Sequence, residues 1–395
     1  MHIEIVTEEF TCEREGLDIR GIQVYPKGGE RCPIIIFSHG FTGCYADLKD
    51  FCTVFARMGY AAFAHSFCGG SADLRESRHK SDGATTEMSV LTEVRDLLAV
   101  KDYAKAQSFT DESKLVLAGF SQGGFVSGIA AARSTDVSKL ILVFPALCIP
   151  DHARRGCLGG APQYDPLNPP QILDCGRIKI GRKFHEEAFG MDPYLELSGY
   201  KGPVLLLQGT CDSVVNYSYA IRAKEEYEPG QCHLQLIREM DHGYDENMQE
   251  SLIASMRQFL QERKEILTIR VILTHREESA QEGKRTIKLF FTGYCETPYF
   301  RGTILPGACD TQEYEGDDCT GIRAEYTLEG LDCANNRCKI HVVNQKGSDD
   351  WEPVIDTDSE ALSWLSEEKL TAVLEHSSDG PTVRIFAGKD CAQRI

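Results

Sequence analysis

The sequence predicts a doubly wound, mostly parallel α/β sheet followed by a smaller all-β, barrel-like domain. Residues 1–265 alternate short apolar runs with longer segments of helical character, which is typical of a parallel sheet covered by helices. Several of the short runs are continuously apolar, as expected of strands buried on both faces. Beyond residue 265 the chain changes to short runs separated by Gly, Asp and Asn, which predicts antiparallel strands in a barrel or sandwich.

The elements of the first domain follow in order along residues 1–265. Its opening segments, HIEIVTEEF and LDIRGIQVY, are expected to pair antiparallel at the sheet edge. The further strands are predicted at 34–38, 60–66, 114–120, 139–145, 203–209 and 233–239. The helices are predicted at 46–59, 86–107, 122–134, 216–228 and 246–264. Within 86–107, an apolar stripe at nearly helical spacing is formed by Met88, Leu91, Val94, Leu98 and Tyr103.

The segment 146–200 breaks this alternation. It is too long for a simple crossover and is rich in proline, glycine and mixed charge. Long insertions of this kind are often functional loops, so we expect a lid over a binding site.

The second domain is predicted to cover residues 266–395. Its strand-like runs are LTIRVILTH, RTIKLFFTG, IRAEYTLEG, CKIHVVNQ and TVRIFAG. The stretch SEALSWLSEEKLTAVLEHSS, residues 359–378, is the only segment of this domain for which we predict helix.

Composition excludes several classes of partner. Of the 395 residues, 42% are hydrophobic and 26% charged, as in a globular protein. The formal net charge of −18 would repel nucleic acid and anionic membranes, so we expect neither as a partner. The N-terminal stretch has no secretory pattern, and the 16 cysteines are scattered, so we expect reduced thiols and a cytoplasmic location. The spacing of Cys333 and Cys338 fits no zinc motif, and we expect no metal and no cofactor.

The stretch Gly119-Phe120-Ser121-Gln122-Gly123 matches the pattern G-x-S-x-G. The pattern alone is weak, but here it lies between an apolar strand and a helix rich in small residues. A sharp strand-to-helix turn strains the serine backbone and exposes its hydroxyl, and small neighbours allow the close approach. We therefore predict Ser121 as a nucleophile.

A serine nucleophile needs a base and an orienting acid, which in this arrangement follow later strands in the order acid, histidine. Asp212 lies three residues past the strand at 203–209, and His242 follows the strand at 233–239. We predict these two as acid and base. Asp241 and Asp245 are competing acids.

The stretch FSHGFTG, residues 37–43, follows the first buried strand and can direct backbone N–H groups at the nucleophile. Enzymes of this type take one oxyanion donor from that loop and one from the residue after the serine. This assigns the backbone amides of Phe41 and Gln122. The ring of His39 is expected to brace the loop.

Together, HGFTG, GFSQGG, GTCDSVV and DHGYDE resemble the cinnamoyl and feruloyl esterases among bacterial α/β-hydrolases, over about residues 20–262. The resemblance implies carboxylic-ester hydrolysis by Ser121, Asp212 and His242, and a lid in 146–200 that holds an aromatic acid. It also implies Asp151 and Tyr164 as substrate-binding residues. Residues 266–390 resemble a bacterial β-barrel family of unknown function, on RGTILPGACDTQ and GIRAEYTLEGLDCANNRCKIHVVN.

The expected function is therefore hydrolysis of small esters, those of aromatic acids included. Two alternatives remain open: acyl transfer or peptide hydrolysis on the same fold, and a ligand-binding protein in which the β-domain carries the main role. A homodimer formed through the β-domain is a further expectation.

Overall fold

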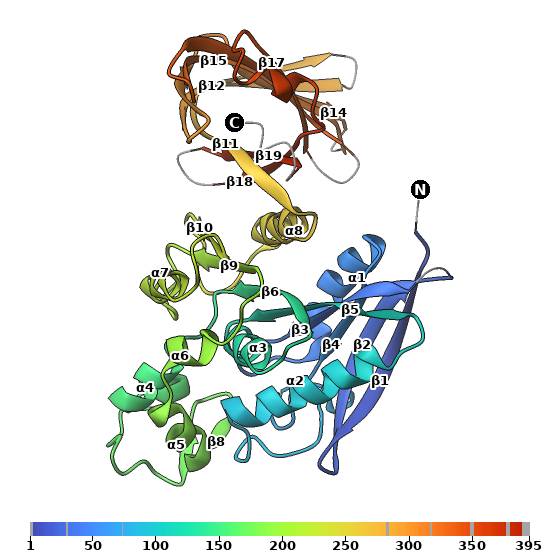
Figure 1. Ribbon diagram of the computed structural model, residues 1–395, viewed down its shortest axis with the longest axis vertical. Helices are drawn as coiled ribbons and strands as arrows, with labels where there is room; N and C mark the ends of the chain where they lie inside the picture. Colours follow the sequence, from blue (N-terminus) through green and yellow to red (C-terminus); the bar gives the residue numbers. More distant parts are fainter. Residues whose placement is uncertain are drawn as a thin grey trace. The chain divides into compact units, whose positions relative to one another are not determined.

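The computed structural model describes residues 3–28, 31–72, 74–281, 284–316, 318–347, 351–376 and 380–388. The chain divides into two compact units, Met1–His242 and Gly243–Ile395 (Figure 1). The domain boundary expected at residue 265 stays a prediction. In the described part of the chain, no helix combines the length and apolar character needed to cross a membrane.

The first unit is built on an eight-stranded sheet with the order β1-β2-β4-β3-β5-β6-β9-β10. The strands are β1 Ile5–Arg14, β2 Leu17–Pro26, β3 Cys32–Ser38, β4 Ala61–His65, β5 Thr110–Phe120, β6 Val137–Val143, β9 Val204–Gly209 and β10 Cys232–Ile237. β1 and β2 pair antiparallel at one edge, as predicted, and β2 is antiparallel to β4. The strands from β4 to β10 are parallel to one another. This confirms the predicted fold class.

Helices cover both faces of this sheet. They are α1 Lys49–Arg57 after the 3₁₀ turn η1 Tyr45–Leu48, α2 Val90–Lys105, α3 Gln122–Ala132 and α7 Ser218–Glu225, with a short turn η2 at Ser77–His79. α2 and α3 pack against each other on the face opposite α1 (Figure 1). The central strands and α3 are almost entirely buried, which explains their continuously apolar sequences.

The segment 146–200 folds into short elements. They are α4 Ile149–Arg155, η3 Leu158–Gly160, the hairpin β7 Ile172–Asp174 and β8 Lys179–Gly181, α5 Arg182–Gly190 and α6 Pro193–Leu197. Leu197 packs directly on the backbone of α3 at Gly128, where a Cβ would collide with it. The segment is thus anchored to the helix that follows Ser121, while its action as a lid stays a prediction.

The second unit contains α8 Glu246–Leu260 and a nine-stranded antiparallel sheet. Its strands are β11 Arg263–Gln281, β12 Lys284–Glu296, β13 Phe300–Ile304, β14 Cys309–Glu315, β15 Asp318–Asp332, β16 Arg337–Lys346, β17 Trp351–Thr357, β18 Thr371–Glu375 and β19 Thr382–Gly388. β11 pairs with both β12 and β19, which closes the sheet into a barrel. The all-β prediction is confirmed, and the core of the barrel is apolar.

The helix predicted over 359–378 is wrong for most of its length. Only Ser363–Ser366 form a 3₁₀ turn, η4, and the run that follows is strand β18. A short apolar run fits a helix or a strand equally well by pattern alone. Here Thr371–Glu375 pair with β19, and this pairing stabilises the strand. Residues 377 and 378 lie outside the described part of the chain.

Candidate active site

Ser121 occupies the turn between β5 and α3. Its backbone has φ 53° and ψ −119°, a left-handed conformation that is strained for a residue with a side chain. Gly119 and Gly123 make the turn possible: a Cβ on Gly119 would collide with the carbonyl of Gly123. A Cβ on Gly123 would collide with the carbonyls of Ser38 and His39 at the end of β3. The pattern G-x-S-x-G therefore has a steric cause at this turn.

The structure brings Ser121, His242 and Asp212 together from three separate loops. The Ser121 hydroxyl lies 2.8 Å from Nε2 of His242. Nδ1 of the same ring lies 3.0 Å from Oδ2 and 3.1 Å from Oδ1 of Asp212. A carboxylate at Nδ1 favours the tautomer that keeps Nε2 free to accept the serine proton. The three side chains have the geometry of an activated nucleophile.

Asp212 is held by its surroundings as a carboxylate. It accepts hydrogen bonds from the backbone N–H groups of Val214, at 2.9 Å, and Val215, at 2.7 Å, and from the side-chain amide of Gln208. Burial acts to raise the pKa of Asp212, but the hydrogen bonds from His242, Val215 and Val214 outweigh it and hold this pKa below its ordinary value. The carboxylate is thus charged when it faces the imidazole.

Asp241, a competing acid in the sequence, braces the two loops instead. Its Oδ1 accepts hydrogen bonds from the backbone and hydroxyl of Ser213 and from the backbone N–H of His242. The hydrogen bonds from Ser213 lower the pKa of Asp241 to about 2. Asp245, the other competitor, caps α8 by accepting from the N–H of Met248. Neither contact joins these carboxylates to the imidazole ring.

The first predicted oxyanion donor belongs to the peptide that joins Ser121 to Gln122. The carbonyl of Ser121 accepts hydrogen bonds from the N–H groups of Gly124, Phe125 and Ala146, at 2.9–3.1 Å. In a trans peptide the N–H points away from the carbonyl, so fixing the carbonyl also fixes the N–H of Gln122. This donor is held in place before any substrate arrives, as oxyanion stabilisation requires.

The second predicted donor belongs to the peptide that joins Gly40 to Phe41. The carbonyl of Gly40 accepts from Nδ1 of His39 at 2.7 Å and from the N–H of Gly43 at 3.0 Å. A Cβ on Gly40 would lie only 3.1 Å from Cβ of Ser121, so this loop runs directly beside the nucleophile. The N–H of Phe41 is fixed in the same way as that of Gln122.

His39 connects this loop to the one after β4. Its Nε2 accepts a hydrogen bond from the N–H of Phe67 at 3.1 Å, which requires a neutral ring protonated at Nδ1. Burial lowers the pKa of His39 to about 4, and the ring is therefore neutral at pH 7. These contacts fit the bracing role expected from the sequence.

The two predicted substrate-binding residues already have protein partners. Asp151 accepts from the hydroxyl of Tyr219 at 2.7 Å and from Arg154 at 3.1 Å. Tyr164 donates to Nδ1 of His185 at 2.8 Å, within the segment 146–200. The contacts in the described residues do not join either of them to Ser121. Their role in binding substrate stays a prediction.

Sequence reasoning missed two residues beside the site. Phe144, with φ 36°, places its ring 4.9 Å from that of His242. Glu93 of α2 is 1% exposed and accepts from the side-chain amide of Gln122 at 2.7 Å. A signal for Glu93 was present, because position 93 falls on the buried helical face formed by Val90 and Leu97.

Known proteins resemble the first unit of this chain in sequence and fold. The profile of the prolyl oligopeptidase family matches residues 52–143. The structure of Est1E from Butyrivibrio proteoclasticus with bound ferulic acid is 28% identical with a TM-score of 0.56, covering 64% of this chain and 98% of that chain. A second Est1E structure is 26% identical with a TM-score of 0.55 and the same coverage of both chains.

A third structure extends the likeness in fold alone. The α/β hydrolase GrgF from Penicillium sp. sh18 is 19% identical with a TM-score of 0.52, covering 66% of this chain and 98% of that chain. No curated protein matches the sequence. The first unit has the α/β-hydrolase fold. The likeness to a feruloyl esterase expected from the sequence is confirmed. The chain is a serine hydrolase.

Proposed function

We propose that the protein hydrolyses small carboxylic esters by a Ser121–His242–Asp212 mechanism that needs no cofactor. The observation that carries this proposal is the 2.8 Å contact between the hydroxyl of Ser121 and Nε2 of His242, made by a serine with a strained backbone. A hydroxyl in this position loses its proton to the imidazole as it attacks a carbonyl carbon.

The proposed reaction has two stages. In the first, His242 takes the Ser121 proton, the serine oxygen attacks the ester carbonyl, and the N–H groups of Phe41 and Gln122 bind the resulting oxyanion. The imidazolium then gives its proton to the departing alcohol, which leaves an acyl-enzyme. In the second, His242 activates a water molecule that releases the acid and restores Ser121. Asp212 stabilises the imidazolium in both stages.

For the acid part of the ester we propose an aromatic acid of the hydroxycinnamate type. The support is the similarity to Est1E, whose structure contains ferulic acid. Asp151 and Tyr164, in the segment 146–200, are the proposed binding residues. Asp151 accepts a hydrogen bond from the hydroxyl of Tyr219, and the thiol of Cys148, three residues before Asp151, contacts the carbonyl of Val214 in the loop of Asp212.

The test is hydrolysis of nitrophenyl acetate and methyl ferulate by the wild type and by Ser121→Ala. We expect activity in the wild type and a loss of at least about 10⁴-fold in the variant, because the variant lacks the hydroxyl that forms the acyl-enzyme. Equal rates in the two proteins would contradict the mechanism. A preference for acetyl over feruloyl esters would retain the mechanism and reject the aromatic acid.

Peptide hydrolysis is the second candidate, because the matching profile is that of the prolyl oligopeptidase family. The same triad can attack an amide, but the leaving amine needs a proton delivered at the moment of bond cleavage. An ester and an anilide of the same acid, assayed side by side, separate ester hydrolysis from peptide hydrolysis. We expect hydrolysis of the ester, and faster cleavage of the anilide would favour the peptidase.

A further inference from the structure

We propose that Glu93 of α2 is a positioning residue for the oxyanion donor of Gln122, an inference that rests on the proposed ester hydrolysis. The side chain of Gln122 is 3% exposed, and its amide nitrogen donates to Oε2 of Glu93 at 2.7 Å. The residue that offers its backbone N–H to the oxyanion is therefore also anchored by its side chain. α2 and α3 pack together where this hydrogen bond joins them.

The surroundings of Glu93 point to a carboxyl group that is neutral and acts as an acceptor. Its described contacts contain no ion pair, and its Oε1 lies against Gly70, where a Cβ would approach it to 3.3 Å. Burial raises the pKa of Glu93 to about 8, with the hydrogen bond from Gln122 opposing this and the charge of Asp96 adding to it. A neutral group avoids placing a negative charge beside the site of an oxyanion.

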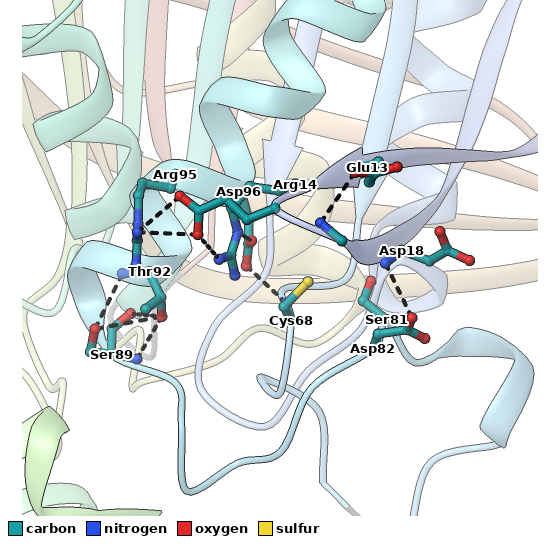
Figure 2. Close-up of polar contacts among 12 residues, drawn as sticks. Glu13, Arg14, Asp18, Cys68, Ser81, Asp82, Ser89, Thr92, Arg95 and Asp96 are labelled. Atoms are coloured by element: carbon teal, nitrogen blue, oxygen red, sulfur yellow. Dashed lines mark hydrogen bonds and ion pairs between the residues drawn. The ribbon is translucent and has the colours of Figure 1, made fainter.

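The neighbouring buried carboxyl of α2 has different hydrogen-bond partners, although burial raises the pKa of Asp96 as well. Asp96, one turn along the helix, pairs with the guanidinium of Arg14 at 2.6 Å and accepts from the N–H of Cys68 at 2.8 Å (Figure 2). Those contacts join α2 to β1 and to the loop after β4. Glu93, by contrast, accepts its hydrogen bond from Gln122, the first residue of α3 and the neighbour of Ser121.

A positioning role predicts a specific kinetic change. Without Glu93, the buried side-chain amide of Gln122 loses its hydrogen-bond acceptor. The first turn of α3 can then shift so that this amide finds another acceptor. Oxyanion donors act in the transition state, and small displacements there reduce kcat while leaving ground-state binding largely unchanged. A general loss of stability would instead lower the folded fraction without altering kcat of the folded molecules.

The experiment compares Glu93→Leu, Glu93→Gln and a matched cavity variant, Leu97→Ala, with nitrophenyl acetate as substrate in the full chain. Leu97 is fully buried on the same helix and has no polar group, so Leu97→Ala destabilises α2 without removing the acceptor of the Gln122 side chain. We expect Glu93→Leu to lower kcat about tenfold with an unchanged KM, and Glu93→Gln to recover most of it by supplying an amide oxygen. Leu97→Ala should keep the wild-type kcat per folded molecule.

A second variant covers the case in which Glu93→Leu does not fold. Gln122→Met keeps the backbone donor and removes the side-chain hydrogen bond, and it should give the same loss in kcat. The loss in the double variant Glu93→Leu/Gln122→Met should match that of a single variant, because both remove one interaction. A kcat for Gln122→Met equal to that of the wild type would overturn the inference. Absence of Ser121-dependent hydrolysis in the wild type would instead overturn the proposed function, and the inference with it.

Discussion

The barrel wall and the surroundings of Ser121 both bury charged or ionisable side chains, but they satisfy them differently. In the barrel, Arg384 of β19 is 9% exposed and pairs with Glu375 at 3.0 Å and with Glu265. In the first unit, the described contacts of Glu93 contain only the uncharged amide of Gln122 as a hydrogen-bond partner. In the barrel a buried cation pairs with two carboxylates, whereas burial raises the pKa of Glu93 to about 8 and so favours its neutral form.

The difference follows from what each region has to do. An ion pair inside a sheet joins neighbouring strands, and this structural role requires no change in the charge of either partner. Around Ser121, negative charge develops on the substrate oxygen during the proposed reaction and must be stabilised by fixed N–H dipoles. Nearby side chains therefore have to orient those dipoles without adding charge.

The largest effect is expected from Asp212→Asn in the first unit. An asparagine keeps the shape but favours the wrong tautomer of His242 and cannot stabilise its cation, so kcat should fall by about 10⁴-fold. Circular dichroism and Tm should show a folded protein. A kcat within about tenfold of the wild type would show that the Asp212–His242 contact does not act in catalysis.

The next largest effect is expected in the barrel, from Arg384→Met. Removing the guanidinium takes away the cation that pairs with the buried carboxylate of Glu375 and the partly buried one of Glu265, which should lower the free energy of unfolding by about 3–5 kcal/mol. Ester hydrolysis at 25 °C should continue, because Ser121, Asp212 and His242 all lie in the first unit.

Arg323→Met is the matched control for this prediction. The Arg323–Glu325 pair is exposed, and its loss should cost no more than about 1 kcal/mol. Both variants are compared by denaturant unfolding of the full chain. Equal stability of the two variants would mean that the buried pair contributes no more than an exposed one.

A smaller effect is expected from pH at Glu93. Its folded pKa of about 8 lies above the ordinary value, so the folded chain binds more protons than the unfolded chain between about pH 4.5 and 8. The free energy of unfolding should therefore fall as pH rises through this window. Above pH 8 the ionised carboxylate should also repel the oxyanion and lower kcat severalfold.

Glu93→Gln tests this directly, because an amide has no charge to gain. Profiles of kcat and Tm against pH for the wild type and the variant should diverge as pH rises, with the variant losing less of either quantity. Profiles that stay parallel from pH 5 to 9 would show that Glu93 does not ionise in this range.

The sequence was most informative where one local cause determines the structure. Continuous apolar runs located the central strands, and two glycines around Ser121 located the turn, because backbone crowding there excludes larger residues. The order of Asp212 and His242 followed from their places after β9 and β10. These features depend on short stretches of chain and on a sheet topology that the strand pattern already indicates.

Features that depend on contacts between distant residues were not predictable in this way. Glu93 and Gln122 are 29 positions apart, and a glutamate on a helix gives no sign of its partner until α2 and α3 pack. Strand β18 was predicted as helix because its form is set by pairing with β19. Closure of the barrel likewise required the pairing of β11 with β12, which the pattern within each strand does not reveal.

Covalent labelling of Ser121 tests whether this residue forms the covalent intermediate. The wild type is incubated with a nitrophenyl phosphonate, digested and analysed by mass spectrometry alongside Ser121→Ala. We expect one phosphonyl adduct, on the peptide that contains Ser121, formed in proportion to the loss of ester hydrolysis and absent from the variant. Full inactivation with Ser121 unmodified, or an adduct on another residue, would contradict this expectation.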